Sequence, residues 1–171
     1  MPNYIRNQVY GGIYFFTLVT YNRRPFFSEK ASADILLNAI KLTQNRNPFD
    51  LIAYCLLYDH LHLLIGLPYE DNSFSQKVRS IKRSTTLGIR KSLGKPDLVI
   101  WQNRFWEHTI RDEEDFKNHF DYVHYNPVKH GYVNDYADWV WSSYHQCYID
   151  EPKLARIEPE SMGENKRCFG E

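Results

Sequence analysis

Two histidines separated by one residue are the first feature of the sequence that can do chemistry. His60 and His62 begin an apolar run typical of a β-strand, in which side chains alternate between the two faces. Both imidazoles therefore project from one face and can bind a single divalent ion; the alternative is a solvent-facing pair. No thiolate lies nearby in the sequence, and imidazole and oxygen ligands favour Mg²⁺ or Mn²⁺ over a structural zinc ion.

A predicted helix that begins at Asp112 supplies the second set of groups. Its apolar stripe is formed by Phe116, Phe120 and Val123. A polar stripe beside it is formed by Asp115, His119, Tyr122 and Asn126. Tyr125 points away from the core, so Tyr122 is the tyrosine that can face a site, with Asn126 one turn further on and within reach of the same ion. The alternative is that Tyr122 is a half-buried packing residue.

Together these groups suit the cleavage of a phosphodiester. A tyrosine hydroxyl has a reference pKa of about 10 and is a weak nucleophile at neutral pH. A divalent ion polarises the phosphodiester oxygen and stabilises the charge of the transition state. Attack by Tyr122 on phosphorus would give a phosphotyrosine intermediate that keeps the bond energy, so that a second strand end can be joined. A hydrolase that uses water would lose that energy.

These side chains have to be positioned by a small α+β fold. The predicted strands are Ile13–Tyr21, Leu51–Leu57, Leu61–Leu67 and Val99–Ile110. The predicted helices are Ala31–Gln44, Ser73–Leu93 and one from Asp112 to about Tyr125, which ends there because Pro127 disfavours helix at the residue before it. The order β-α-β-β-α-β is that of a ferredoxin-like split βαβ core, here with an added C-terminal helix that carries Tyr122.

We expect one domain over residues 1–150 and a C-terminal tail of low order over residues 151–171, because that stretch is polar and contains proline. The three cysteines are odd in number and have no paired spacing, which argues against a disulfide framework or a zinc knuckle. The N-terminus does not resemble a signal peptide, and the apolar run Ile13–Val19 is too short to span a bilayer. We therefore expect a cytoplasmic protein without a membrane partner.

Charge is balanced overall, with 21 basic and 21 acidic residues, but it is unevenly distributed. Between Ser73 and Arg104 eight basic residues accompany a single acid, whereas acids predominate from Glu107 to Asp121. A basic face of this kind suits a protein that holds a polyanion; the alternative is a solvated helix face. The candidate contacts to a DNA backbone are Lys82, Arg83, Arg90, Lys91, Arg104 and Arg111, with Trp101 as a candidate for stacking on a base. Ion pairs with nearby acids are the alternative for the last two arginines.

Three segments in a fixed order carry a family resemblance. They are Tyr58–Leu64, Phe105–Arg111 and Tyr122–Gly131, followed by Trp139 and Trp141–Ser143. Together they resemble the REP-associated tyrosine transposases, relatives of the single-strand transposases of small bacterial insertion sequences. The likeness covers the chain from Gly11 to Tyr148.

The resemblance implies an HUH endonuclease that nicks and joins single-stranded DNA at short palindromic hairpins through a 5′-phosphotyrosine intermediate. It implies that His60 and His62 are paired metal ligands, that Asn126 is the third ligand and that Tyr122 is the nucleophile. The sequence departs from the family twice. Asp59 stands where Asn is common, which adds a charge near the metal, and the chain is neutral where the family is usually basic, which bears on DNA binding at high salt.

Two other functions stay open at this stage. The chain can be a module that binds hairpin nucleic acid without cleaving it, although the intact set of His60, His62 and Tyr122 argues against decay. It can also be a metal phosphodiesterase that uses water, with Tyr122 only positioning the substrate. The sequence does not decide between a monomer and a homodimer.

Overall fold

Four strands form one antiparallel sheet in the order β2-β3-β1-β4. The strands are β1 (Ile13–Val19), β2 (Asp50–Leu56), β3 (His60–Gly66) and β4 (Trp106–Thr109). The computed structural model in which they are seen describes residues 7–149, so the predicted tail lies outside the described residues. The order in the sheet differs from the order in the chain because β1 lies between β3 and β4. As a result β3, which carries the two histidines, is one of the two inner strands.

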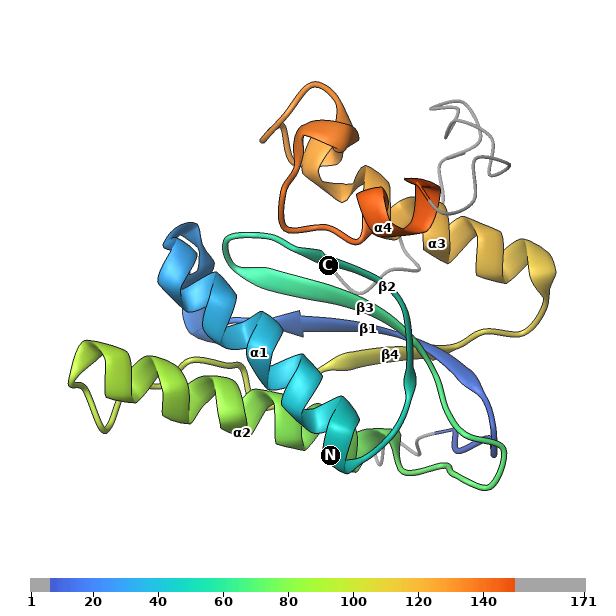
Figure 1. Ribbon diagram of the computed structural model, residues 1–171, viewed down its shortest axis with the longest axis horizontal. Coiled ribbons are helices and arrows are strands. Elements are labelled where there is room, and N and C mark those ends of the chain that lie inside the picture. The colour runs from blue at the N-terminus through green and yellow to red at the C-terminus, as the bar shows by residue number, and fades with distance from the viewer. Residues whose placement is uncertain (1–6, 150–171) are drawn as a thin grey trace.

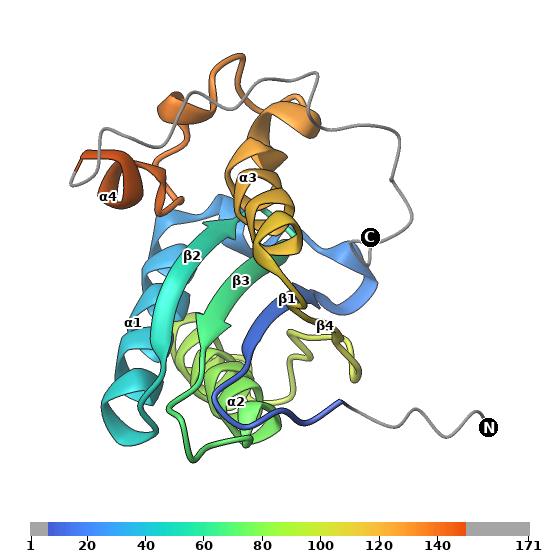
Figure 2. The ribbon, with the colours of Figure 1, turned by 90° about the vertical axis from the view of Figure 1, so that its right-hand side faces the viewer.

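Helices cover both faces of this sheet. Helices α1 (Lys30–Arg46) and α2 (Phe74–Leu93) lie on one face, and α3 (Glu113–Lys129) lies on the other, followed by the short α4 (Tyr144–Ile149) (Figures 1 and 2). Three short 3₁₀ turns complete the described elements, at Tyr21–Arg23, Phe26–Ser28 and Tyr136–Asp138. The predicted order β-α-β-β-α-β plus a helix is confirmed, and so is the α+β class. Within residues 7–149, no helix combines the length and apolar character needed to cross a bilayer.

The alternation of side chains along β3 separates two cores. Leu61, Leu63 and Ile65 pack into the core beneath α1 and α2. Leu64 packs into the second core, with Phe15 from β1 and with Phe120 and Val123 from α3. His60 and His62 share the parity of Leu64, so they face α3, as the strand pattern predicted. Apolar burial on both faces therefore holds the histidine-bearing strand rigidly in place.

The segment after α3 covers the outer edge of β2. The backbone amide of Leu56 donates to Trp141 O at 2.8 Å, and Trp139 Nε1 donates to Leu56 O at 2.9 Å. Two residues earlier on the strand, the amide of Tyr54 donates to Ser143 Oγ at 2.8 Å. These bonds satisfy groups that an uncovered edge strand would leave open for pairing with another chain.

The fourth strand is much shorter than predicted. The sequence predicted a strand over Val99–Ile110, whereas β4 spans only Trp106–Thr109 and Trp101 makes an isolated bridge to Thr20. The chain before β4 still bonds to β1, since the amide of Gln102 donates to Val19 O at 2.9 Å. The carbonyls of Gln102 and Asn103 are bound by the ammonium of Lys82 at 2.6 and 3.2 Å, and the regular ladder with β1 begins at Trp106.

Helix α3 is longer than predicted, because it continues through Pro127 to Lys129. Asp112 caps its start, as predicted, by accepting a hydrogen bond from the amide of Asp115 at 2.8 Å. Pro127 removes one backbone donor, but its ring is buried and the next turn closes through the amide of His130 on Asn126 O at 3.0 Å. The helix ends at Lys129, and Gly131, two residues further on, has a φ of +70° that only glycine adopts readily.

Candidate active site and basic groove

The two histidines of β3 are buried beneath α3 and do not face solvent. His60 is 1% exposed and His62 is 0% exposed, and their ring centroids lie 4.9 Å apart. Asp59 Oδ1 lies 2.6 Å from Nδ1 of His60, and Thr17 Oγ1 lies 3.1 Å from Nδ1 of His62. Because an oxygen orients Nδ1 of each ring, Nε2 is the atom suited to bind a metal ion.

Asp59, which replaces the asparagine common in the resembling family, is the orienting group for His60. Burial by itself would raise the pKa of Asp59, but hydrogen bonds from His60 and from Arg23, at 3.1 Å, outweigh that effect and lower it. Asp59 is therefore an ionised carboxylate at neutral pH, and it makes its neighbouring imidazole a better electron donor.

The polar stripe of α3 lies over these histidines. The ring of Tyr122 is 5.4 Å from that of His62 between centroids, and the side chain is 4% exposed. Asn126, one turn on, is 0% exposed, and its Nδ2 donates to Tyr122 O at 2.8 Å. Its Oδ1 is buried and has no hydrogen-bond partner among residues 7–149. An amide oxygen and two imidazoles suit a divalent cation, so the residues present fit such an ion.

Two residues that the sequence analysis missed lie against this site. Lys129 Nζ donates a hydrogen bond to the hydroxyl of Tyr122 at 2.9 Å, and the ring of His130 lies 5.0 Å from that of His60 between centroids. Both were missed because the predicted helix ended before Pro127. The seven-residue spacing from Tyr122 to Lys129, two helical turns, is the signal that a longer helix would have made visible.

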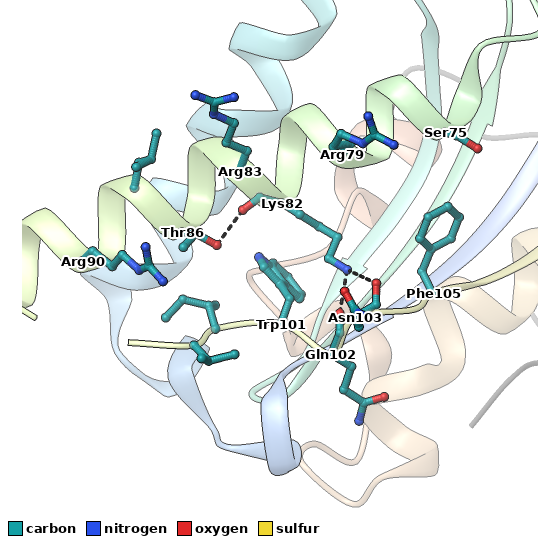
Figure 3. Close-up of a pocket in the computed structure, with 13 residues that line it drawn as sticks. Ser75, Arg79, Lys82, Arg83, Thr86, Arg90, Trp101, Gln102, Asn103 and Phe105 are labelled. Atoms are coloured by element: carbon teal, nitrogen blue, oxygen red, sulfur yellow. Dashed lines mark hydrogen bonds between the residues drawn. The ribbon is translucent and has the colours of Figure 1, made fainter. Parts of the chain in front are cut away.

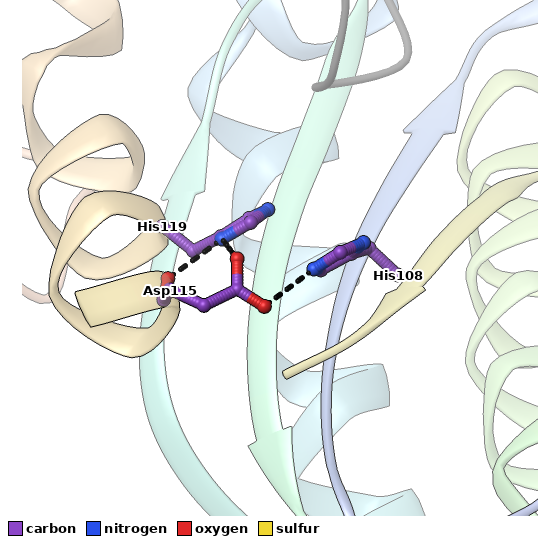
Figure 4. Close-up of side chains that lie close together, drawn as sticks. All are labelled: His108, Asp115 and His119. Carbon is purple, nitrogen blue, oxygen red and sulfur yellow. Dashed lines mark hydrogen bonds and ion pairs between the residues drawn. The ribbon is translucent and has the colours of Figure 1, made fainter. Parts of the chain in front are cut away.

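A second cluster of polar groups lies further along the same stripe, where α3 meets β4 (Figure 4). His108 Nε2 is 2.8 Å from Asp115 Oδ2, and His119 Nδ1 is 3.1 Å from Asp115 Oδ1. The three ligand atoms all lie within 4.8 Å of one another, so among the described residues these side chains can hold a metal ion. Phe15 separates this cluster from the histidine pair, with its ring 5.0 Å from His119 and 5.4 Å from His62.

The same carboxylate already has other donors. The backbone amide and Nε of Arg111 bind Asp115 Oδ2 at 3.0 and 3.1 Å. Burial alone would raise the pKa of Asp115, but the hydrogen bonds from His108 and Arg111 outweigh it and lower the pKa to about 2. Asp115 thus joins the end of β4 to the first turn of α3. Arg111 makes the ion pair that was the alternative to a phosphate contact.

A basic groove of about 740 Å³ lies on the other side of the sheet, between α2 and the segment before β4 (Figure 3). Its basic lining residues are Arg79, Lys82, Arg83 and Arg90. Val99–Asn103 and Phe105 form the opposite wall. The groove places exposed guanidinium groups over a largely apolar floor.

Some of the residues predicted to contact DNA line this groove, and others lie outside it. Lys82 and Arg90 line it but also hold its far wall, since Arg90 Nε donates to Leu98 O at 2.8 Å. Trp101 lines the groove with its indole mostly buried and 5.4 Å from the ring of Phe27 between centroids. Lys91 and Arg104 are outside the lining.

Comparison with known proteins bears on this arrangement. The family model described as "Transposase IS200 like" matches residues 8–126. A Haemophilus influenzae protein assigned as a REP-associated tyrosine transposase is 39% identical over 173 residues, which is 96% of this chain and 95% of that protein. The REP-associated tyrosine transposase of Escherichia coli is 37% identical over 148 residues, 85% of this chain and 84% of its own.

The chain belongs to the IS200-like transposase family. Within that family it groups with the REP-associated tyrosine transposases, which confirms the resemblance drawn from the ordered motifs. It is accordingly a tyrosine transposase of the HUH single-strand DNA endonuclease family.

Solved structures agree with this assignment. A REP-associated tyrosine transposase bound to a REP hairpin superposes on this transposase with a TM-score of 0.85 at 33% identity, covering 100% of this chain and 98% of that one. A transposase crystal structure from Deinococcus radiodurans has a TM-score of 0.52 at 18% identity and covers 67% of this chain and 91% of its own. The second likeness shows the shared fold alone.

Proposed function

We propose that this transposase nicks and rejoins single-stranded DNA next to a hairpin, with Tyr122 as the nucleophile, on a ferredoxin-like core to which α3 is added as the catalytic helix. The observation that carries the proposal is the buried contact between Tyr122 and the histidine pair, with ring centroids of Tyr122 and His62 5.4 Å apart. A tyrosine that only packed would not need two buried imidazoles and a buried amide oxygen beside it.

The metal proposed for this site is Mg²⁺ or Mn²⁺, held by Nε2 of His60, Nε2 of His62 and Oδ1 of Asn126. When bound, such an ion supplies Lewis-acid stabilisation of the charge that develops on the phosphodiester. Asp59 and Thr17 then act on the histidines, because their contacts with the Nδ1 atoms fix the direction in which Nε2 points.

The protein groups do the rest of the chemistry. The oxygen of Tyr122 attacks phosphorus and the bond to the 3′-oxygen breaks, which leaves a 5′-phosphotyrosine and a free 3′-hydroxyl. Phe15, whose ring centroid lies 6.0 Å from that of Tyr122, holds the tyrosine ring edge-on and keeps water from one side of it. The linkage survives until a 3′-hydroxyl reverses the step, which joins the two strand ends.

We propose that the hairpin is held through the basic groove. The solved relative at 33% identity is bound to a REP hairpin. In this chain, Arg79 and Arg83 are exposed on α2 and one helical turn apart, a spacing that suits successive phosphates. Because Lys82 and Arg90 tether the opposite wall to α2, the groove is preformed.

The test replaces Tyr122 by phenylalanine, which keeps the ring and removes the nucleophilic oxygen. Labelled hairpin oligonucleotides with single-stranded flanks, taken from repeats beside the gene, are incubated with protein and Mn²⁺ and run on a denaturing gel. The wild-type chain is expected to give a labelled band at protein mass. Tyr122→Phe or EDTA is expected to abolish that band, while hairpin binding by Tyr122→Phe stays within about twofold of wild type.

The same gel separates the other functions. Cleavage without a labelled protein band would identify a metal phosphodiesterase that uses water. A mobility shift on a native gel without any cleavage would identify a binding module. An adduct that persists in Tyr122→Phe would show that another residue is the nucleophile. Tyr125→Phe, three residues further along α3, is the matched control and should leave the adduct intact.

A further inference from the structure

The ammonium of a lysine, Lys129, lies against the hydroxyl oxygen of Tyr122, the nucleophile proposed above. Lys129 Nζ donates to the Tyr122 hydroxyl at 2.9 Å and lies 4.8 Å from the centre of its ring. The hydroxyl oxygen is the atom that would bond to phosphorus, so Lys129 touches the reacting group directly. The inference below rests on the function proposed for Tyr122.

The fold produces this contact only because α3 continues past its proline. Tyr122 and Lys129 are two turns apart on one helix face, and Lys129 is the last residue of α3. Had the helix ended at Tyr125, as the sequence suggested, Lys129 would lie in the following loop. The backbone bond from His130 to Asn126 O closes the turn that carries Lys129 onto the tyrosine.

Tyr122 and Lys129 differ in solvent exposure, and this difference suits catalysis. Tyr122 is buried, whereas Lys129 is an exposed residue whose ammonium lies over the tyrosine ring. Because Lys129 is exposed, the positive charge beside the buried oxygen does not have to be desolvated in full. A scissile phosphate that approached Tyr122 would meet this charge at the same time as the tyrosine.

We propose that Lys129 is a catalytic residue that stabilises negative charge on the Tyr122 oxygen in both directions of the reaction. In cleavage, the hydroxyl proton passes to water, the tyrosine oxygen bonds to phosphorus and the phosphorus–O3′ bond breaks, after which the 3′-oxygen takes a proton from water. In joining, a deprotonated 3′-oxygen bonds to phosphorus and the tyrosine oxygen leaves with the electron pair. The ammonium of Lys129 donates its hydrogen bond to that oxygen throughout.

Charge stabilisation on a single oxygen makes a distinct kinetic prediction. Removal of one donor to a developing oxyanion typically slows an enzyme by ~10²-fold. Lys129→Met keeps the length of the side chain and removes the charge, so cleavage and rejoining should both slow by about that factor. Hairpin binding should stay near wild type, because Lys129 lies on α3 and not in the basic groove. Lys129→Arg restores a donor and should recover most of the loss.

The experiment measures single-turnover adduct formation with the labelled hairpin oligonucleotide and Mn²⁺, and then the release of the adduct by an added 3′-hydroxyl strand. Lys117→Met is the matched control, since Lys117 is an exposed lysine of the same helix that is three turns away. A second readout places 3,5-difluorotyrosine at position 122. Its more acidic phenol needs less charge stabilisation, so the Lys129→Met defect should shrink there.

Each outcome bears on one claim. Equal rates for Lys129→Met and the wild-type chain, or a faster rate, would overturn the role of Lys129 and would indicate that the contact only holds the tyrosine at rest. A defect of the same size with tyrosine and with difluorotyrosine would also overturn it, since a purely structural loss does not depend on phenol acidity. An adduct that survives in Tyr122→Phe would instead overturn the proposed function, so the two failures are distinguishable.

Discussion

At the scale of single residues, the site depends on the burial of groups that water would otherwise solvate. His62 and Asn126 are both fully buried. The ring of His62 lies against those of Tyr122 and of Phe15 from β1, and the amide of Asn126 donates to the carbonyl of Tyr122. Placing polar atoms in such a position costs free energy unless a partner offsets it, which is why clusters of this kind mark functional sites. The sequence suggested a solvent-facing pair as the alternative, and the structure excludes it.

The metal assignment gives a prediction at this scale. His62→Ala should abolish the calorimetric binding signal for Mn²⁺ at the Tyr122 site and lower the yield of covalent adduct by at least ~10²-fold, because it removes one of three ligands. His145→Ala is the control, since His145 is an exposed histidine of α4. Heat of Mn²⁺ binding that is unchanged in His62→Ala but lost in His108→Ala would move the metal to the cluster at the start of α3.

At the scale of elements, the hydrophobic periodicity of the sequence predicted correctly which face of a strand or helix each residue occupies. It predicted poorly where β4 and α3 begin and end. The alternation in β3 and the polar stripe of α3 were predicted because neighbours in the chain determine which side of a strand or helix a residue occupies. The limits of β4 and α3 did not follow from local pattern. The carbonyl of Gln102 is bound by Lys82 of α2, twenty residues earlier, and Pro127 is buried within a helix that its own residue type disfavours. Lys129 was overlooked for that reason and not for lack of a signal in its residue type.

The groove of α2 gives the prediction for this scale. Arg83→Ala should weaken hairpin binding to a similar extent for hairpins of different sequence, and it should reduce the slope of log affinity against log salt by about 1, as expected for one phosphate contact. Fluorescence anisotropy at four salt concentrations measures both. Lys41→Ala removes the same charge from the exposed face of α1, outside the groove lining, and should change neither.

At the scale of the whole molecule, the segment Trp139–Ser143 belongs to the fold, while residues 151–171 were predicted to be a tail of low order. We propose that residues up to 150 form the single folding domain. A chain that ends at Asp150 should keep the urea midpoint of the full protein. A chain that ends at Asp138 loses the buried Trp139 and the bonds to Leu56 and Tyr54, and should be less stable by at least ~3 kcal/mol. Equal midpoints for the two truncated chains would contradict this domain boundary.

The two faces of the sheet are covered unequally, since two long helices lie on one and α3 with its short C-terminal neighbours lies on the other. We therefore expect the second core to open more readily than the first, so that the amides of α3 exchange with solvent sooner than those of α1 and α2. Such an opening would carry Tyr122 and Lys129 away from the histidines and leave the basic groove unchanged. A hairpin held in the groove, as proposed, would then stay bound while the proposed nucleophile is withdrawn.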